Sequence, residues 1–130
     1  MKYPPKRREL EYAAITGEEA LAMGRATTEL FRRWRITDNQ AAVLLRVSIR
    51  TYRGWKSGRM GRIGRVTRER LSLLMGIHML LRTIFSEPER AYAWIHAANS
   101  AFDGQPALEV MLGGDLARVR RYLESERDFW

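Results

Sequence analysis

Apolar residues recur with the period of a helix through most of the chain, and glycine or proline residues separate the periodic segments. This pattern predicts an all-α fold. The predicted helices cover residues 17–34, 38–45, 48–57, 65–85, a segment that begins near residue 88, 107–112 and 116–126. At 130 residues the chain is long enough for one domain, or for two small helical modules that share a core.

The segment 37–56 predicts two short helices joined by a tight turn at Arg46 and Val47. Thr37 and Ser48 are good N-cap residues, because each hydroxyl can accept a hydrogen bond from a free N–H group of the following turn. The spacing of the apolar residues allows one small core. That core would contain Ala42, Leu45, Val47, Tyr52 and Trp55.

The outer face of the second helix in this hairpin is basic. Arg50, Arg53 and Lys56 lie there beside Ile49. Basic side chains suit the phosphates and guanine edges of a DNA major groove, and an apolar side chain suits a thymine methyl group. We therefore expect a DNA-binding surface made of Ser48, Ile49, Arg50, Thr51, Arg53, Lys56, Arg59 and Arg62. The alternative is an amphipathic hairpin whose basic face is only solvated.

This hairpin resembles the helix-turn-helix of the phage-repressor-like Xre class, and the resemblance implies DNA binding through the second helix. Arg46 stands where the family usually has a turn glycine, and Asp38 stands where it has an early glutamine, with Gln40 close by. Gly54 falls inside the second helix, where glycine costs about 1 kcal/mol relative to alanine. It also shortens the reach at a position where the family often places a residue that reads a base.

Charge is distributed unevenly along the chain. The net charge is +8; residues 1–70 hold 17 Lys and Arg against 7 Asp and Glu, a balance of +10, and residues 71–130 hold 6 against 8, a balance of −2. Residues 46–70 alone carry nine basic side chains and the single acid Glu69, and the segment 1–15 is expected to be a basic arm. The charge balance therefore favours binding of nucleic acid by the first half and binding of a protein surface by the second half.

Several function classes are disfavoured by the sequence. There is no cysteine, no apolar run as long as a membrane span, and no apolar segment after the basic N-terminus that would make a secretory signal. We expect a bacterial cytoplasmic protein that does not bind to membranes. His78 and His96 each lack a second His or Cys at metal-ligand spacing, and no catalytic set of residues is present. We therefore expect no enzyme activity, no metal site and no cofactor.

Two longer helices frame the hairpin. The first follows a capping box at residues 16–19, and its inward stripe is expected to contain Leu21, Gly24, Thr28, Phe31 and Trp34. The second, at residues 65–85, is apolar around nearly its whole circumference, which indicates burial on all sides. Either it is the central core helix of a monomer, or it associates with a second copy; we expect a homodimer. The resulting division is an arm at 1–15, a DNA-binding module at 16–64, and a second helical domain at 65–130 for dimerisation and for binding a protein partner.

The last third of the chain is expected to contain three short helices. Ser86 is expected to cap the first, with Pro88 in its first turn and Ala98 among its apolar residues. A turn follows at 99–105, Pro106 opens the next helix, and Gly113 and Gly114 end it. Asp115 is expected to cap the last helix.

Residues 85–123 resemble the toxin-binding domain of the Xre/MbcA/ParS antitoxins. The positions that carry the resemblance are Phe85, Pro88, Glu89, Arg90, Ala91, Trp94, Ile95, Asn99, Phe102, Gly104, Pro106, Leu108, Met111, Gly113, Gly114, Val119 and Leu123. Ala98 departs from the family, which usually has proline before the asparagine. The resemblance implies an antitoxin that blocks a RES-domain, NAD-degrading toxin and represses its own operon.

The C-terminal residues Arg127, Asp128, Phe129 and Trp130 are the expected toxin contacts, because the family's C-terminal end approaches the toxin cleft. Burying two large aromatic side chains stabilises a protein or a complex by about 3–5 kcal/mol, and this free energy is not gained if they stay in water. A partner pocket would bury them, and folding back on their own domain would do so equally well. Two other function classes remain open: a stand-alone helix-turn-helix regulator whose C-terminal half only dimerises, and an adaptor with no DNA role.

Overall fold

The structure is a computed structural model that describes residues 17–129, and every named element within that range is helical. The α-helices are α2 (Gly17–Arg33), α3 (Asp38–Leu45), α4 (Ile49–Lys56), α5 (Arg65–Ile84), α6 (Pro88–His96), α7 (Ala107–Leu112) and α8 (Leu116–Phe129), with a short 3-10 helix at Ser100–Phe102. One isolated antiparallel bridge joins Ala98 and Pro106. The predicted all-α fold is confirmed.

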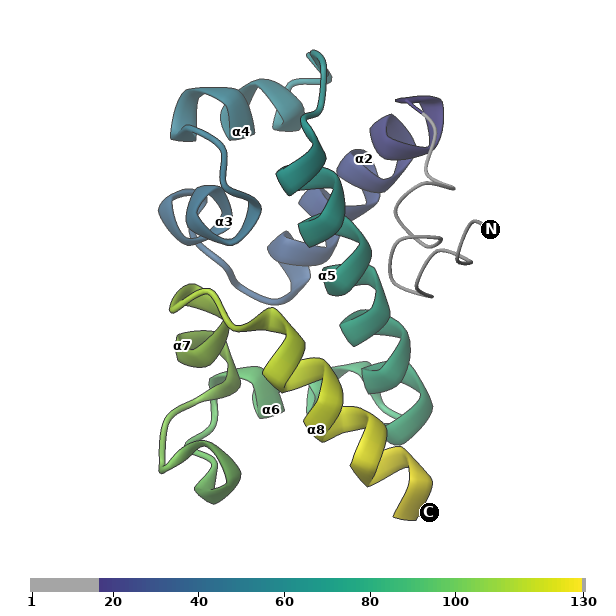
Figure 1. Cartoon of the computed structure of the whole chain (residues 1–130), viewed down its shortest axis with the longest axis vertical. Coiled ribbons are helices and arrows are strands. Elements are labelled where there is room, and N and C mark those ends of the chain that lie inside the picture. The colour runs from purple at the N-terminus through teal and green to yellow at the C-terminus, as the bar shows by residue number, and fades with distance from the viewer. Residues whose placement is uncertain (1–16, 130) are drawn as a thin grey trace, which may run out of the picture.

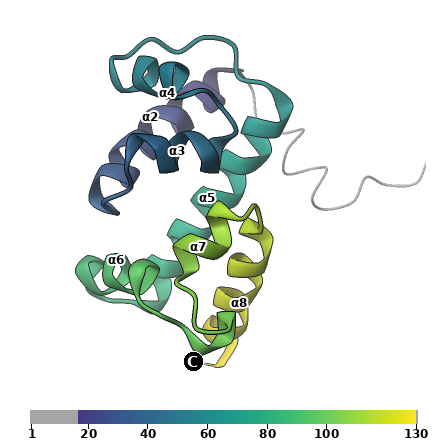
Figure 2. The ribbon, with the colours of Figure 1, turned by 90° about the vertical axis from the view of Figure 1, so that its left-hand side faces the viewer.

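Helix α5 runs through the molecule as its central element (Figure 1). The helices α2, α3 and α4 surround its first half, and α6, α7 and α8 surround its second half (Figure 2). A single hydrophobic core extends through both groups, and α5 contributes Leu71, Leu74, Ile77 and Leu81 to it. The two groups are therefore two modules that share one core.

The expectation that α5 is buried on all sides is wrong. Met79 is 60% exposed and Val66 is 56% exposed, so α5 is open to solvent at two separate places. Neighbouring helices of the same chain cover the other faces, because α2, α3, α6 and α8 all pack against α5. The apolar sequence of this helix is thus explained largely by its central place in one protomer.

The predicted caps lie at the N-termini of both helices of the helix-turn-helix, α3 and α4. The Thr37 side chain accepts from the N–H of Gln40 at 3.1 Å, and the Gln40 side chain accepts from the N–H of Thr37 at 3.0 Å, which completes a capping box. Ser48 accepts from the N–H of Thr51 at 3.0 Å. Arg46 adopts the left-handed conformation, with φ of 58°, where glycine would meet no steric penalty.

Helix α5 holds the end of α3 through two side chains. The Thr67 hydroxyl donates to the carbonyl oxygen of Leu45 at 2.9 Å, and the Arg70 guanidinium donates to the carbonyl oxygen of Leu44 at 3.1 Å. These are among the carbonyl groups that a helix C-terminus leaves without intrahelical partners. The orientation of the helix-turn-helix on α5 is therefore fixed by hydrogen bonds as well as by apolar packing.

Three local expectations are wrong. On α2 the buried threonine is Thr27, whose hydroxyl donates to the Met23 carbonyl oxygen at 2.7 Å, whereas Thr28 lies nearer the surface. Glu87, and not Ser86, occupies the N-cap position of α6, and it makes no side-chain capping bond. Ala98 lies beyond the end of α6. Each expectation was wrong by one or two positions, an error smaller than one turn of helix, which periodicity alone does not resolve.

Helix α8 is longer than expected. It continues to Phe129, so the residues after Glu126 form its last turn and do not leave the domain as an extended tail. The arm expected at residues 1–15 and the cap expected at Thr16 lie outside the described residues, as does Trp130.

Candidate DNA-binding and toxin-binding surfaces

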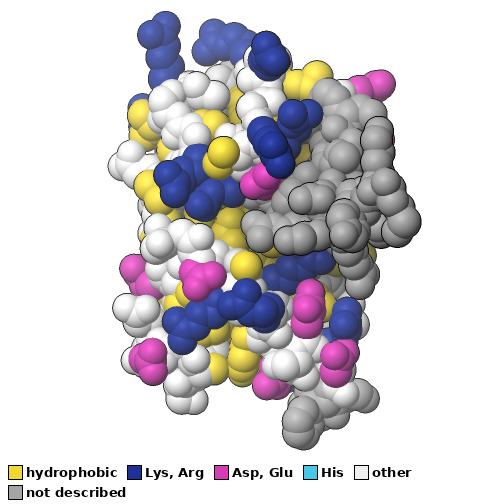
Figure 3. All heavy atoms as spheres, viewed as in Figure 1, with side chains coloured by type: hydrophobic (Ala, Val, Ile, Leu, Met, Phe, Trp, Pro, Cys, Tyr) yellow, Lys and Arg dark blue, Asp and Glu magenta, His cyan; other side chains and the backbone are white. Residues whose placement is uncertain are grey.

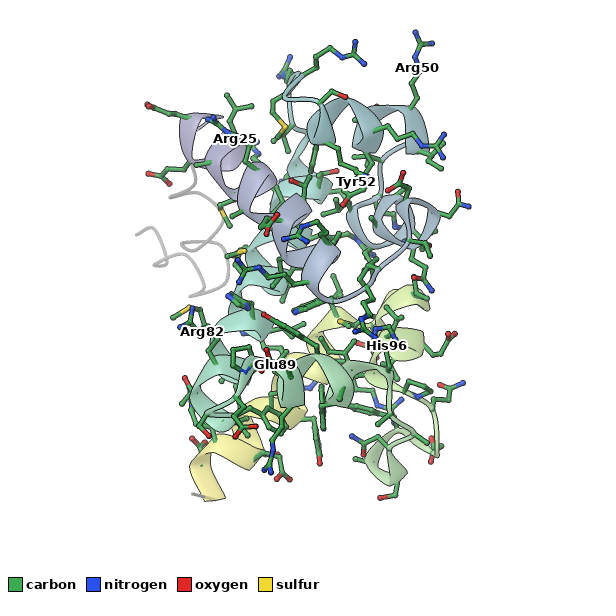
Figure 4. The ribbon with its side chains drawn as sticks, turned by 180° about the vertical axis from the view of Figure 1, so that it is seen from behind. Arg25, Arg50, Tyr52, Arg82, Glu89 and His96 are labelled. Carbon is green, nitrogen blue, oxygen red and sulfur yellow. The ribbon has the colours of Figure 1, made fainter. Side chains whose placement is uncertain are left out.

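Helix α4 presents two different faces. Tyr52 and Trp55 are buried, and the Tyr52 ring lies 6.2 Å from the Phe31 ring of α2 in a tilted pair. Ala42 and Leu45 of α3 are buried in the same core, and Val47 packs against it, as the spacing predicted. On the opposite face Arg50 extends away from the protein into solvent (Figure 4). Helix α4 is therefore anchored by its aromatic face and leaves its basic face open.

The smaller predicted contact residues surround the start of α4. The hydroxyl oxygens of Ser48 and Thr51 lie 3.0 Å apart, and both residues are exposed. Ile49 is half-buried against the core. These three residues and Arg50 therefore occupy one end of α4, as the sequence predicted, while their contacts with DNA stay a prediction.

Arg53 and Lys56 occupy the other end of the basic face and share one carboxylate. Lys56 Nζ lies 2.8 Å from Asp38 Oδ1, and Arg53 Nε lies 3.2 Å from Asp38 Oδ2. The ammonium of Lys56, and then the guanidinium of Arg53, hold the pKa of Asp38 below its ordinary value. The sequence reasoning missed this contact; the available signal was that Asp38 is the only acidic residue between Glu29 and Glu69.

The loop after α4 carries the other two predicted DNA contacts. Arg59 and Arg62 are exposed, whereas Met60 and Ile63 pack against the core. Met60 reaches Gly24 of α2 so closely that a Cβ on that residue would collide with its methyl group. The apolar residues thus dock the loop while its arginines face outward, and Lys and Arg side chains gather over this end of the molecule (Figure 3).

The C-terminal module contains an aromatic cluster that lies partly at the surface. The rings of Trp94 and Tyr122 are stacked at 6.1 Å, and the Phe102 ring meets the Tyr122 ring edge-on at 5.2 Å. Arg118 lies over Phe102, with Cζ 5.4 Å from the ring centroid. Phe102 is buried, but Trp94 and Tyr122 are half-buried. This cluster joins α6, α8 and the 3-10 helix.

Three of the four predicted toxin contacts, Arg127, Asp128 and Phe129, fall in the last turn of α8. Arg127 and Asp128 are exposed, and Arg127 Nε lies 3.1 Å from Asp128 Oδ1. The side chain of Phe129 and the whole of Trp130 lie outside the described residues. The role of these four residues in toxin binding stays a prediction.

The two histidines lie in different environments. His78 is half-buried on α5 beside a cavity of about 310 Å³ between α2, α5 and α6; burial, followed by the charges of Arg82 and Arg33, lowers its pKa. His96, at the end of α6, places Nε2 2.6 Å from the carbonyl oxygen of Trp34. Among the described residues, no three His, Asp or Glu side chains come together as they would to hold a metal ion.

The fold is a helix-turn-helix module followed by a small helical domain, both built on one long helix. Residues 13–76 match the family described as the antitoxin Xre-like helix-turn-helix domain, and residues 80–128 match the antitoxin Xre/MbcA/ParS C-terminal toxin-binding domain. The chain belongs to the Xre/MbcA/ParS antitoxin family, whose members are not enzymes.

Two individual proteins extend this comparison. The chain is 40% identical over 99 residues to the "Uncharacterized protein y4oB" of Sinorhizobium fredii, a match that covers 73% of this chain and 76% of that protein. In fold it is similar to a chain in the crystal structure of the M. tuberculosis MbcT–MbcA toxin–antitoxin complex, with a TM-score of 0.59 and 16% identity over 81% of this chain and 93% of that one. Within the described residues, no helix is long and apolar enough to cross a membrane.

Proposed function

We propose that this chain is the antitoxin of a bacterial type II pair that binds and blocks a RES-domain, NAD-degrading toxin and represses its own operon. It acts in the cytoplasm and engages paired operator half-sites as a homodimer. One observation carries the proposal: an open cationic helix and a toxin-binding domain are built on the two halves of the same helix, α5. A single chain can thereby hold DNA at one end and a protein at the other.

The exposed face of α4 supports the DNA-binding half of the proposal. Its arginines lie outside a core that fixes the helix, and the exposed arginines Arg59 and Arg62 lie in the loop that directly follows α4. A helix so placed can enter a major groove while the flanking cations contact phosphates. The charge balance of +10 in residues 1–70 is consistent with this role.

Two observations support the toxin-binding half. The matched family is defined by toxin binding, and the solved structure with a similar fold is a complex of a toxin with its antitoxin. The half-buried pair Trp94 and Tyr122 and the exposed Arg127 also offer the residue types that dominate protein–protein interfaces. The family match favours an antitoxin over a regulator whose C-terminal half only dimerises.

Expression together with a RES-domain protein encoded by a neighbouring gene tests the toxin partner. The pair should co-purify, and the loss of NAD caused by the toxin should stop when the antitoxin is present. A stand-alone regulator would bind operator DNA but would leave the rate of NAD loss unchanged. That result would reject the antitoxin function.

Arg50→Ala tests the DNA surface, with Arg82→Ala as its control. Both residues are exposed arginines of the same chain, and Arg82 lies well away from Arg50, at about mid-height on the other side of the view (Figure 4). If Arg50 contacts a base, its loss should weaken binding to the DNA upstream of the gene by about 1–3 kcal/mol. If it contacts a phosphate, its loss should reduce the slope of log affinity against log salt concentration by about 1. The Arg82 variant should bind DNA like the wild type. Equal losses in both variants would reject α4 as the recognition helix.

A further inference from the structure

The carboxylate of Asp38 is placed where it neutralises two of the three basic side chains on α4. Each of its oxygens faces a different cation, at 2.8 Å for Lys56 and 3.2 Å for Arg53. Arg50 is the one basic side chain of α4 that has no ion pair within the described part of the chain. The basic face therefore carries less uncompensated charge than the sequence suggests.

The carboxylate is held more firmly than the cations that it binds. The Asp38 side chain is 27% exposed, whereas those of Arg53 and Lys56 are 63% and 49% exposed. Asp38 is also the first residue of α3, where the positive end of the helix dipole favours an acid. DNA phosphates can therefore reach the two cations from outside while the carboxylate stays fixed behind them.

We propose that Asp38 competes with DNA phosphate for Arg53 and Lys56, and so holds down the affinity of this helix-turn-helix for any duplex. This inference rests on the proposed DNA-binding function. To contact phosphates, both side chains must exchange a nearby carboxylate for them. Once the DNA is bound, the fixed negative charge of Asp38 lies close behind the phosphates. Their separation is well below the Debye length, so salt screens the repulsion between them only weakly.

The chain supplies a matched control for this inference at a site away from α4. Glu29 also binds two arginines, with Arg32 Nη2 at 2.6 Å and Arg33 Nε at 3.2 Å from its Oε1. All three lie at the C-terminal end of α2. Asp38→Asn and Glu29→Gln each remove one negative charge and release two basic side chains, so a general effect of net charge would appear equally in both variants.

The experiment measures the affinity of the full-length chain for a labelled duplex of the DNA immediately upstream of its gene, by fluorescence anisotropy at several salt concentrations. Asp38→Asn should bind about 2- to 30-fold more tightly than the wild type, the range expected for breaking two exposed ion pairs. Its plot of log affinity against log salt should be steeper by about 1. Asp38→Glu keeps the charge and should bind about as weakly as the wild type.

Each alternative outcome identifies a different failure. If Asp38→Asn binds more weakly while its urea unfolding midpoint is unchanged, Asp38 orients the two cations for DNA and the competition is refuted. If Glu29→Gln gains as much affinity as Asp38→Asn, the effect belongs to net charge and the assignment to Asp38 is overturned. If no variant binds this duplex, the proposed DNA-binding function fails, and the inference fails with it.

Discussion

Replacing Thr67 by valine removes one hydrogen bond between α5 and the end of α3 at almost constant volume. The Thr67 hydroxyl is buried and donates to the carbonyl oxygen of Leu45 at 2.9 Å. Valine keeps the shape and the β-branch but leaves that carbonyl group without this donor. An unsatisfied buried acceptor costs about 1–3 kcal/mol. For a chain of this size the unfolding temperature should fall by roughly 3–12 °C.

Thr83→Val is the matched control on the same helix. The Thr83 hydroxyl donates to the Met79 carbonyl oxygen at 2.9 Å, but this bond is exposed, so water replaces the lost partner. Its loss should change stability by less than about 0.5 kcal/mol. Thermal unfolding followed by circular dichroism compares the two variants. Equal unfolding temperatures would show that the bond from α5 to the end of α3 adds nothing to stability, and would refute this explanation of how the helix-turn-helix is held.

Two other predictions concern the buried tyrosine and the C-terminal turn. Burial, with a smaller contribution from the charge of Asp38, raises the pKa of Tyr52 to about 12, so stability present below pH 10 should be lost between pH 10 and 12. The wild type should lose roughly 3 kcal/mol of unfolding free energy across this range, measured by urea unfolding, and Tyr52→Phe should abolish that loss. If the variant loses as much stability as the wild type, ionisation of Tyr52 does not cause the loss. Deleting residues 127–130 should release toxin activity and leave DNA affinity intact. Full neutralisation by the shortened protein would exclude the last turn of α8 as the blocking element.

The helix-turn-helix could be predicted from sequence because its determinants are local. The caps at Thr37 and Ser48 act within one turn, and the positions of Tyr52 and Trp55 determine which face of α4 is buried. Register errors arose where the turns themselves decide the outcome, at Ser86 and Ala98. Ala98 forms a bridge with Pro106 beyond the end of α6, and α6 begins one residue later than expected, after Glu87. Periodicity carries no information about either feature.

The sequence by itself determined the helical class, the basic first half, and the outward direction of Arg50, because periodicity and composition are properties of short segments. Only the tertiary structure decided that α5 is the shared central helix, that Thr67 and Arg70 hold the end of α3, and that Asp38 pairs with Arg53 and Lys56. These contacts join residues 15 to 26 positions apart. Their distances depend on how the helices pack, and no local pattern encodes that packing.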